Sequence, residues 1–107
     1  MVERYVFVKL KSEHATDEGR KEVIERTLGD LKGIAGLKKI IVGAPADDSA
    51  KEAWDLSIVV VFDSMDAVGP YLSDAAHRKY VDEFLMPRTE VIKYWNFDVD
   101  VAEGPAA

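Results

Sequence analysis

The chain has 107 residues, 48% of them hydrophobic, which is enough for one domain with a modest core and too little for two. Fourteen Lys and Arg against twenty Asp and Glu give a formal net charge of -6, so the field around the protein repels phosphate backbones and anionic lipid. This charge excludes nucleic acid and membrane surfaces as first choices, and the absence of cysteine excludes disulfides and thiolate chemistry.

Targeting and membrane segments are not predicted. No stretch approaches the ~18 apolar residues that a transmembrane helix needs. Met1 is followed almost at once by a strand pattern, without the basic and apolar regions of a secretory signal. A chain without cysteine also fits a reducing compartment. We therefore expect a cytoplasmic protein with no membrane partner.

The first half of the chain predicts a strand, a helix and a second strand. Residues 2–11 are rich in β-branched and aromatic side chains, as strands are. Thr16 is a plausible N-cap. Apolar side chains then recur at helical spacing at Val23, Ile24, Leu28, Leu31 and Ile34. The helix should end near residues 33–36, before a strand over residues 37–42.

The second half predicts two more strands around an interrupted helical region. A loop over residues 43–52 leads to a third strand over residues 54–62, and helical composition follows from Ser64 to Leu85. Gly69-Pro70 and Ser73-Asp74 interrupt this region, so a kink or break is expected there. Pro87 closes it.

The fourth strand should cover residues 91–101, and residues 102–107 should form a loose tail. We therefore predict a single domain over residues 1–101.

The order of these elements is that of a ferredoxin-like unit (βαββαβ), an α+β fold with both helical segments on one face of a four-stranded antiparallel sheet. The strands have no clearly polar face. Alternation along the third strand places Trp54, Leu56, Ile58, Val60 and Phe62 on one face, and Val59 and Val61 on the other. The chain's own helices can cover one face only. We therefore predict a homodimer that pairs through the helix-distal sheet faces.

Several segments together resemble a known family. They are residues 5–11 (YVFVKLK), 34–37 (IAGL), 54–64 (WDLSIVVVFDS), 71–77 (YLSDAAH), Pro87 and residues 97–98 (FD). In order and spacing they are similar to the stress-responsive dimeric α/β-barrel (Dabb) domain family, over about the first hundred residues. The resemblance implies a ferredoxin-like unit and a dimeric α+β barrel made by two chains.

The same resemblance bears on function. The family contains stress-induced proteins without an established reaction and a plant polyketide cyclase that catalyses an aldol condensation. By register, the catalytic histidine of the cyclase falls on His77 and its partner tyrosine on Tyr71. A further pocket histidine falls at about Arg4. Where the family often has His-Pro-Ala-His, this chain has residues 74–77 (DAAH), so it keeps only the second histidine.

His77 and Tyr71 are the candidate catalytic residues. A neutral histidine can accept a proton near pH 7, and a phenol can hold a carbonyl or enolate oxygen by a hydrogen bond. They are six residues apart, which is not same-face spacing on a straight helix, but the break near Ser73 could bring both to one pocket. In the alternative interpretation, His77 ties the helix break to nearby backbone and Tyr71 is a core residue.

The other conspicuous side chains have simpler explanations. His14 is expected to be a solvated loop residue. Asp47, Asp48 and Asp55 are hard oxygen ligands without the spacing of a calcium loop, so we predict no metal site. The aromatic residues Trp54, Tyr94, Trp95 and Phe97 are expected in the core or an interface. No phosphate-binding loop or nucleophile elbow is present in the sequence, and no cofactor is predicted.

Three functions remain open. The first is binding of a small apolar molecule in a pocket between sheet and helices, either as a binding protein or as a cofactor-free acid–base enzyme such as an aldol-type cyclase, isomerase or lyase. The second is a non-catalytic structural stress protein whose pocket is filled by side chains. The third, a cofactor-free oxygenase, rests on fold analogy alone. Open volume beside His77 separates the first from the second.

Overall fold

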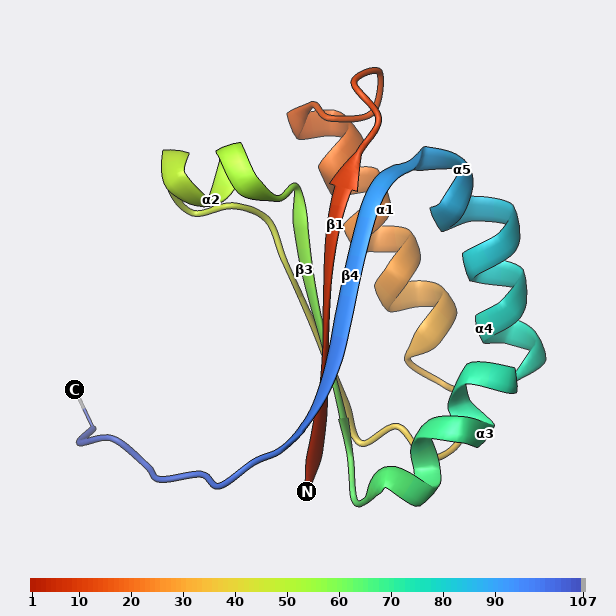
Figure 1. The fold of residues 1–107 in the computed structure, drawn as a ribbon, viewed down its shortest axis with the longest axis vertical. Helices are drawn as coiled ribbons and strands as arrows, with labels where there is room; N and C mark the ends of the chain where they lie inside the picture. The colour runs from red at the N-terminus through yellow and green to blue at the C-terminus, as the bar shows by residue number, and fades with distance from the viewer. Residues whose placement is uncertain (107) are drawn as a thin grey trace.

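The computed structural model describes residues 1–106. They form a four-stranded antiparallel sheet with strand order β2-β3-β1-β4, covered by helices (Figure 1). The strands are β1 (Val2–Leu10), β2 (Lys39–Gly43), β3 (Leu56–Phe62) and β4 (Thr89–Asp98). β1 is a central strand and pairs with both β3 and β4, so it joins the second half of the chain into one sheet. The predicted ferredoxin-like α+β unit is confirmed.

The helical segments form one layer, with one exception. They are α1 (Asp17–Leu31), α2 (Asp48–Ala53), η1 (Met65–Ala67), α3 (Val68–Ser73), α4 (Ala75–Lys79), η2 (Tyr80–Leu85) and α5 (Met86–Arg88). In Figure 1, α1, α3, α4 and α5 cover one face of the sheet, whereas α2 lies on the opposite side at one end. Among the described residues, no helix is long and apolar enough to cross a membrane. The cytoplasmic location stays a prediction.

The start of α1 follows from local chemistry. The Thr16 hydroxyl accepts a hydrogen bond from the Gly19 N–H at 3.0 Å, as predicted for an N-cap, and Asp17 and Glu18 lie at the positive end of the helix dipole. Gly19 is required for another reason. A Cβ at this position would lie 1.9 Å from the carbonyl oxygen of His14, so only glycine lets the preceding turn pack against the helix.

Several predicted bounds differ from the structure. The loop over residues 43–52 contains α2, whose first turn is capped by Asp47 accepting from the Ala50 N–H at 2.8 Å. β4 ends at Asp98, three residues before the predicted end at residue 101, and residues 99–106 form no helix or strand. Ala107, the last residue of the predicted tail, lies outside the described residues. A single domain over residues 1–101 stays a prediction.

The third strand begins at Leu56 rather than at Trp54, and this changes where Trp54 points. The Asp55 carboxylate accepts from the Leu10 N–H at 2.8 Å and from Nε of Arg20 at 3.0 Å, so Asp55 is turned toward α1. Trp54 instead packs against Phe7 on the other face, with ring centroids 5.7 Å apart. The prediction that Trp54 shares a face with Leu56 is therefore wrong, because burial of the Arg20–Asp55 ion pair overrides strand alternation.

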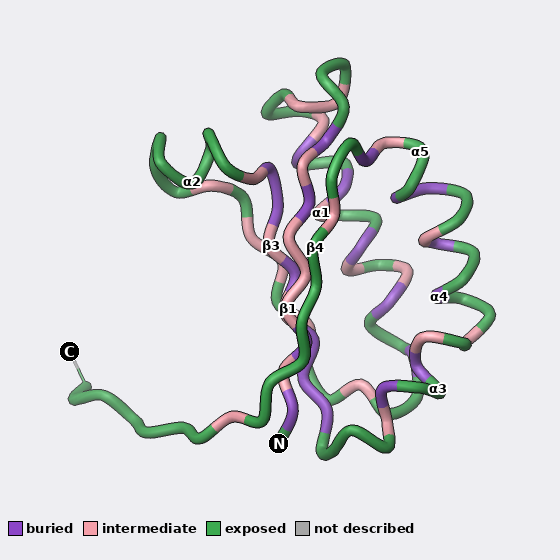
Figure 2. The backbone as a smooth tube through the Cα atoms, viewed as in Figure 1, coloured by how far each residue is buried: buried purple, intermediate pink, exposed green. Residues whose placement is uncertain are grey.

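The core lies between the sheet and the helical layer. Figure 2 shows the buried segments along the strands and on the inner sides of the helices. The largest fully buried side chains include Phe62, Leu10, Leu31 and Leu56. Strand alternation predicts this inward face correctly from Leu56 to Phe62.

The opposite sheet face, which we call the open face, carries Tyr5, Phe7, Ile41, Trp54, Val59, Trp95 and Phe97. The aromatic rings form two groups: Phe7 contacts Trp54 and Trp95, at 5.7 and 6.3 Å between centroids, and Tyr5 contacts Phe97 at 5.7 Å. Trp95 is 50% exposed and Phe97 is 54% exposed. Apart from α2 at one end, no helix covers this face in Figure 1.

Candidate functional site

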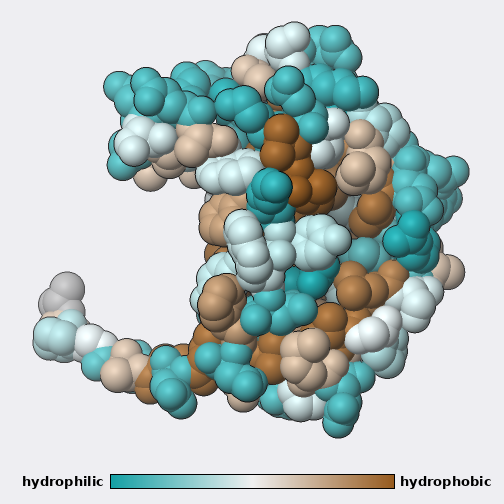
Figure 3. All heavy atoms as spheres, in the orientation of Figure 1, coloured by the Kyte–Doolittle hydropathy of each residue, from teal (hydrophilic) through white to brown (hydrophobic). Residues whose placement is uncertain are grey.

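A cavity of about 520 Å³ lies between the sheet and the helical layer. Its apolar lining includes Val6, Ile58, Val60, Leu85 and Ile92. The polar lining residues include Arg4, Tyr71 and His77. The half-exposed Tyr94 and Met86 also line it, so the cavity reaches the surface beside the edge strand β4. Figure 3 shows apolar surface, in brown, between β4 and the helices.

The break between α3 and α4 places His77 beside Tyr71. α3 ends at Ser73, and the backbone of Asp74 leaves the helical conformation (φ -58°, ψ 137°). The Asp74 side chain accepts a hydrogen bond from the Ala76 N–H at 2.8 Å and so caps the start of α4. The change of direction brings the rings of Tyr71 and His77 to 4.6 Å between centroids. The two residues therefore share one cavity, as the interrupted pattern indicated.

The hydrogen bond of His77 defines its tautomer. Nδ1 lies 3.1 Å from the carbonyl oxygen of Leu72, and a carbonyl can only accept, so Nδ1 carries the proton and Nε2 carries the lone pair. Nε2 makes no hydrogen bond to the described residues. Burial lowers the pKa of His77, and the bond to Leu72 partly opposes this shift. The ring is thus neutral at pH 7, with its basic nitrogen free.

Tyr71 is 2% exposed, and its ring stands edge-on to Phe62 at 5.1 Å between centroids. Its hydroxyl has no hydrogen-bond partner within residues 1–106. In that part of the chain every fully buried side-chain N or O has a partner, so the Tyr71 hydroxyl is not fully buried. The hydroxyl must therefore reach the cavity. Burial raises the pKa of Tyr71 well above its usual range, so the phenol keeps its proton and can act as a donor.

Tyr80, also in the lining, is different. Thr27 donates its hydroxyl proton to the Val23 carbonyl, so the Tyr80 hydroxyl donates to the Thr27 oxygen. Burial raises the pKa of Tyr80 to about 12. Its hydroxyl is already satisfied inside the protein, which makes Tyr80 a packing residue.

Arg4 is the site residue that sequence reasoning did not select. It is 9% exposed, donates from Nη1 to Oδ1 of Asn96 at 3.1 Å, and holds its guanidinium 4.6 Å from the centroid of the Tyr94 ring. A signal was available. Arg4 lies between Val2 and Val6 at an inward position of β1, where alternation calls for an apolar side chain.

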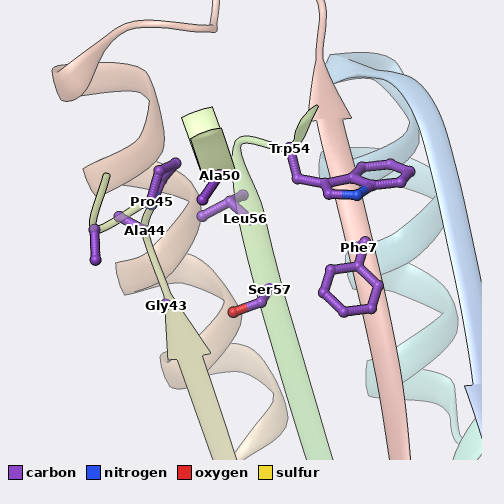
Figure 4. Close-up of a pocket in the computed structure, with 9 residues that line it drawn as sticks. Phe7, Gly43, Ala44, Pro45, Ala50, Trp54, Leu56 and Ser57 are labelled. Carbon is purple, nitrogen blue, oxygen red and sulfur yellow. The ribbon is translucent and has the colours of Figure 1, made fainter. Parts of the chain in front are cut away.

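Other candidates fall outside this cavity. Figure 4 shows a smaller cleft of about 140 Å³ on the open face, lined by Phe7, Trp54, Pro45 and Ser57 among others, with no titratable side chain in its lining. His14 lies in the turn before α1, with Nε2 3.7 Å from a Glu13 carboxylate oxygen. Asp55 is buried in its ion pair with Arg20, at 3.0 Å.

The sequence model of one protein family, the stress responsive A/B barrel domain (Dabb), matches residues 2–100. The chain belongs to this family. No curated protein matches it. The resemblance predicted from the sequence is confirmed.

Solved structures share the fold at low identity. A protein from Arabidopsis thaliana superposes with a TM-score of 0.78 at 16% identity, covering 96% of this chain and 99% of the other. A dimeric ferredoxin-like protein of unknown function from Thermobifida fusca gives 0.78 at 18%, covering 92% and 90%. The hydroxynitrile lyase from Passiflora edulis gives 0.75 at 19%, covering 96% of each. At such identities these likenesses establish the fold alone.

Proposed function

We propose that the protein is a homodimer that binds a small, largely apolar molecule in the cavity beside His77 and Tyr71. The volume of about 520 Å³ lies within the range of small-molecule sites, roughly 300–1,000 Å³. A mostly apolar lining with a few converging polar groups is also typical of such sites. The observation that carries the proposal is the free Nε2 of His77, held toward a cavity by the bond of Nδ1 to Leu72.

A purely structural role for His77 and Tyr71 would predict a filled core, packed as densely as other protein interiors. The open volume beside both residues favours ligand binding instead. The bond of His77 to Leu72 does tie the helix break to backbone, as the structural interpretation expected. That bond uses one ring nitrogen and leaves the other available.

Cofactor-free acid–base catalysis is the second candidate, and it is favoured by the pairing of a neutral imidazole with a protonated phenol. Nε2 of His77 could take a proton from carbon next to a carbonyl, while the Tyr71 hydroxyl donates a hydrogen bond to the enolate oxygen that forms. If His77 returns the proton to a different atom of the enolate, the reaction is an isomerisation. If the enolate carbon instead attacks a second carbonyl, a C–C bond forms, the carbonyl oxygen becomes an alkoxide, and His77 returns the proton to that oxygen, which completes an aldol-type cyclisation. The lyase from Passiflora edulis shows that one protein with this fold is a lyase.

The dimer is proposed from the open face. Trp95 and Phe97 are each about half exposed, and half of an aromatic side chain leaves roughly 100 Å² uncovered. With Tyr5, Phe7 and Ile41 beside them, the patch reaches the few hundred Å² that monomers rarely expose. The neighbour from Thermobifida fusca is described as dimeric. A second copy of the chain would cover this face with a surface of the same kind.

The test uses 4-phenylbutan-2-one, an apolar ketone, followed by NMR in D₂O. We expect the ring signals of His77 to shift on titration, and, if the protein is an enzyme, the protons beside the carbonyl to exchange with deuterium faster than in buffer. His77→Ala should abolish binding or exchange while leaving the dimer intact. His14→Gln, which changes the other histidine outside the cavity, is the matched control and should behave as the wild type.

The outcomes separate the candidates. Binding without accelerated exchange would favour a binding protein, and exchange that depends on His77 would favour the enzyme. Absence of both would contradict the proposal. If His77→Ala lost the fold together with binding, His77 would be structural.

A further inference from the structure

Arg4 differs from the other arginines in lacking a carboxylate partner. Arg20, Arg26, Arg78 and Arg88 each have a carboxylate oxygen within 3.3 Å. Within residues 1–106, no ion pair is formed by Arg4, although it is 9% exposed. Of the two arginines that line the cavity, Arg4 and Arg78, only Arg4 has no counter-ion in the described part of the protein.

The partners that Arg4 does have are weak for a buried charge. They are one amide oxygen, from Asn96, and the face of the Tyr94 ring. A guanidinium offers five N–H donors, and only one hydrogen bond is formed here. Since no fully buried N or O of the described side chains lacks a partner, the remaining donors of Arg4 are accessible, and Arg4 lines the cavity. Burial also lowers the pKa of Arg4, and the nearby Tyr71 and Tyr94 oppose this shift.

The charge of Arg4 influences both candidate catalytic residues, His77 and Tyr71. Its charge contributes to lowering the pKa of His77 and opposes the rise in the pKa of Tyr71. A group bound at Arg4 would therefore lie near both. The other cation in the lining, Arg78, is already paired with Asp82 at 2.9 Å.

The net charge of -6 does not prevent an anion from binding here. Exposed charges farther away than about 8–10 Å are largely screened at physiological salt. A buried guanidinium is screened much less, so it dominates the potential inside the cavity.

We infer that the cavity is built for ligands with an apolar body and one carboxylate, and that the carboxylate pairs with Arg4. The inference deepens the proposed function and rests on it. A carboxylate matches the planar fork of a guanidinium and can take the donors that face the cavity. The apolar lining covers the remainder of the ligand.

The experiment compares 4-phenylbutyrate with its neutral analogue 4-phenylbutanamide, with affinities measured by chemical-shift titration of the full chain. For the wild type we expect the carboxylate to bind about tenfold to hundredfold more tightly than the amide, as for charge-assisted hydrogen bonds. Arg4→Gln should make the two affinities equal, and Arg4→Lys should retain part of the preference. Arg26→Gln is the matched control, because Arg26 also lies over an aromatic ring, at 4.4 Å from the centroid of Phe84, but is paired with Asp30.

A second readout is the pKa of His77, followed by NMR. A bound carboxylate neutralises the charge at Arg4, so the pKa of His77 should rise on binding 4-phenylbutyrate, whereas the amide, which only removes water from the ring, should not raise it. If Arg4→Gln fails to fold, the wild-type preference, the pKa readout and Arg4→Lys still decide the question.

Equal wild-type affinities, with shifts at Tyr71 and His77, would overturn the inference and leave the proposed function standing. Binding of neither compound at millimolar concentration would overturn both. A carboxylate preference that survives in Arg4→Gln would also overturn the role of Arg4.

Discussion

Replacement of Trp95 by Asp is expected to dissociate the proposed dimer. Trp95 lies on β4 in the open face, is 50% exposed, and contacts Phe7 at 6.3 Å between ring centroids. In a monomer an aspartate at this position would stay hydrated, so the fold should survive. In a dimer that pairs open faces, the carboxylate would be buried without a partner.

The magnitude follows from the exposed area. Half of a tryptophan side chain is roughly 120 Å², which corresponds to about 3 kcal/mol at 25 cal/mol per Å². Two-fold symmetry removes this contact twice, so the loss is about 6 kcal/mol per dimer before any cost of burying the charges. At about 1.4 kcal/mol per factor of ten, the dissociation constant should rise by roughly ten-thousand-fold.

The assay is sedimentation velocity over a range of protein concentrations, with circular dichroism to check the fold. Met65→Asp is the matched control, since Met65 is 52% exposed in η1 and lies outside the open face. We expect a dimer for the wild type and the control, and a folded monomer for Trp95→Asp. A dimer that survives Trp95→Asp, or a wild type that is monomeric at all concentrations, would refute pairing through the open face.

Two further predictions concern stability. Gly19→Ala should destabilise the protein by about 1–3 kcal/mol, because the added Cβ would overlap the His14 carbonyl oxygen. Gly29→Ala, in the same helix, meets nothing within 4 Å and should stabilise it by about 0.5–1 kcal/mol; equal denaturation midpoints for the two variants would contradict the packing of the turn before α1. Because burial lowers the pKa of His77 in the folded state, the unfolded chain binds a proton more readily below about pH 6.5, and the free energy of unfolding should fall as pH decreases from 7. His77→Gln should show a flatter pH profile in urea denaturation, and identical slopes would argue against a buried, neutral ring.

Several features of the candidate site could be predicted locally. The break at Ser73-Asp74 is a short-range signal, and it indicated that His77 does not continue the helix that carries Tyr71. The break expected at Gly69-Pro70 is wrong, because both residues lie in the first turn of α3, where a proline is tolerated. The structure places His77 beside Tyr71, as expected. It also leaves open volume beside both, which no local pattern could decide. Whether either residue is catalytic stays a prediction.

The sequence by itself determined the order of the four strands and of the two main helical segments, the Thr16 cap, the inward face from Leu56 to Phe62 and the presence of a second apolar sheet face. These features depend on residues a few positions apart, whose spacing and side-chain chemistry set the local backbone. The ferredoxin-like order then follows from the few ways in which such elements pack.

The tertiary structure alone decided the direction of Trp54 and the surroundings of Arg4. Trp54 turns to the open face because Asp55 is held by Arg20, 35 positions earlier in the chain. Arg4 contacts Asn96, 92 positions later in the chain, because the pairing of β1 with β4 places the two residues opposite each other. Each of these outcomes depends on a polar group finding a partner as it leaves water, and the chain pattern does not specify which distant residue supplies that partner.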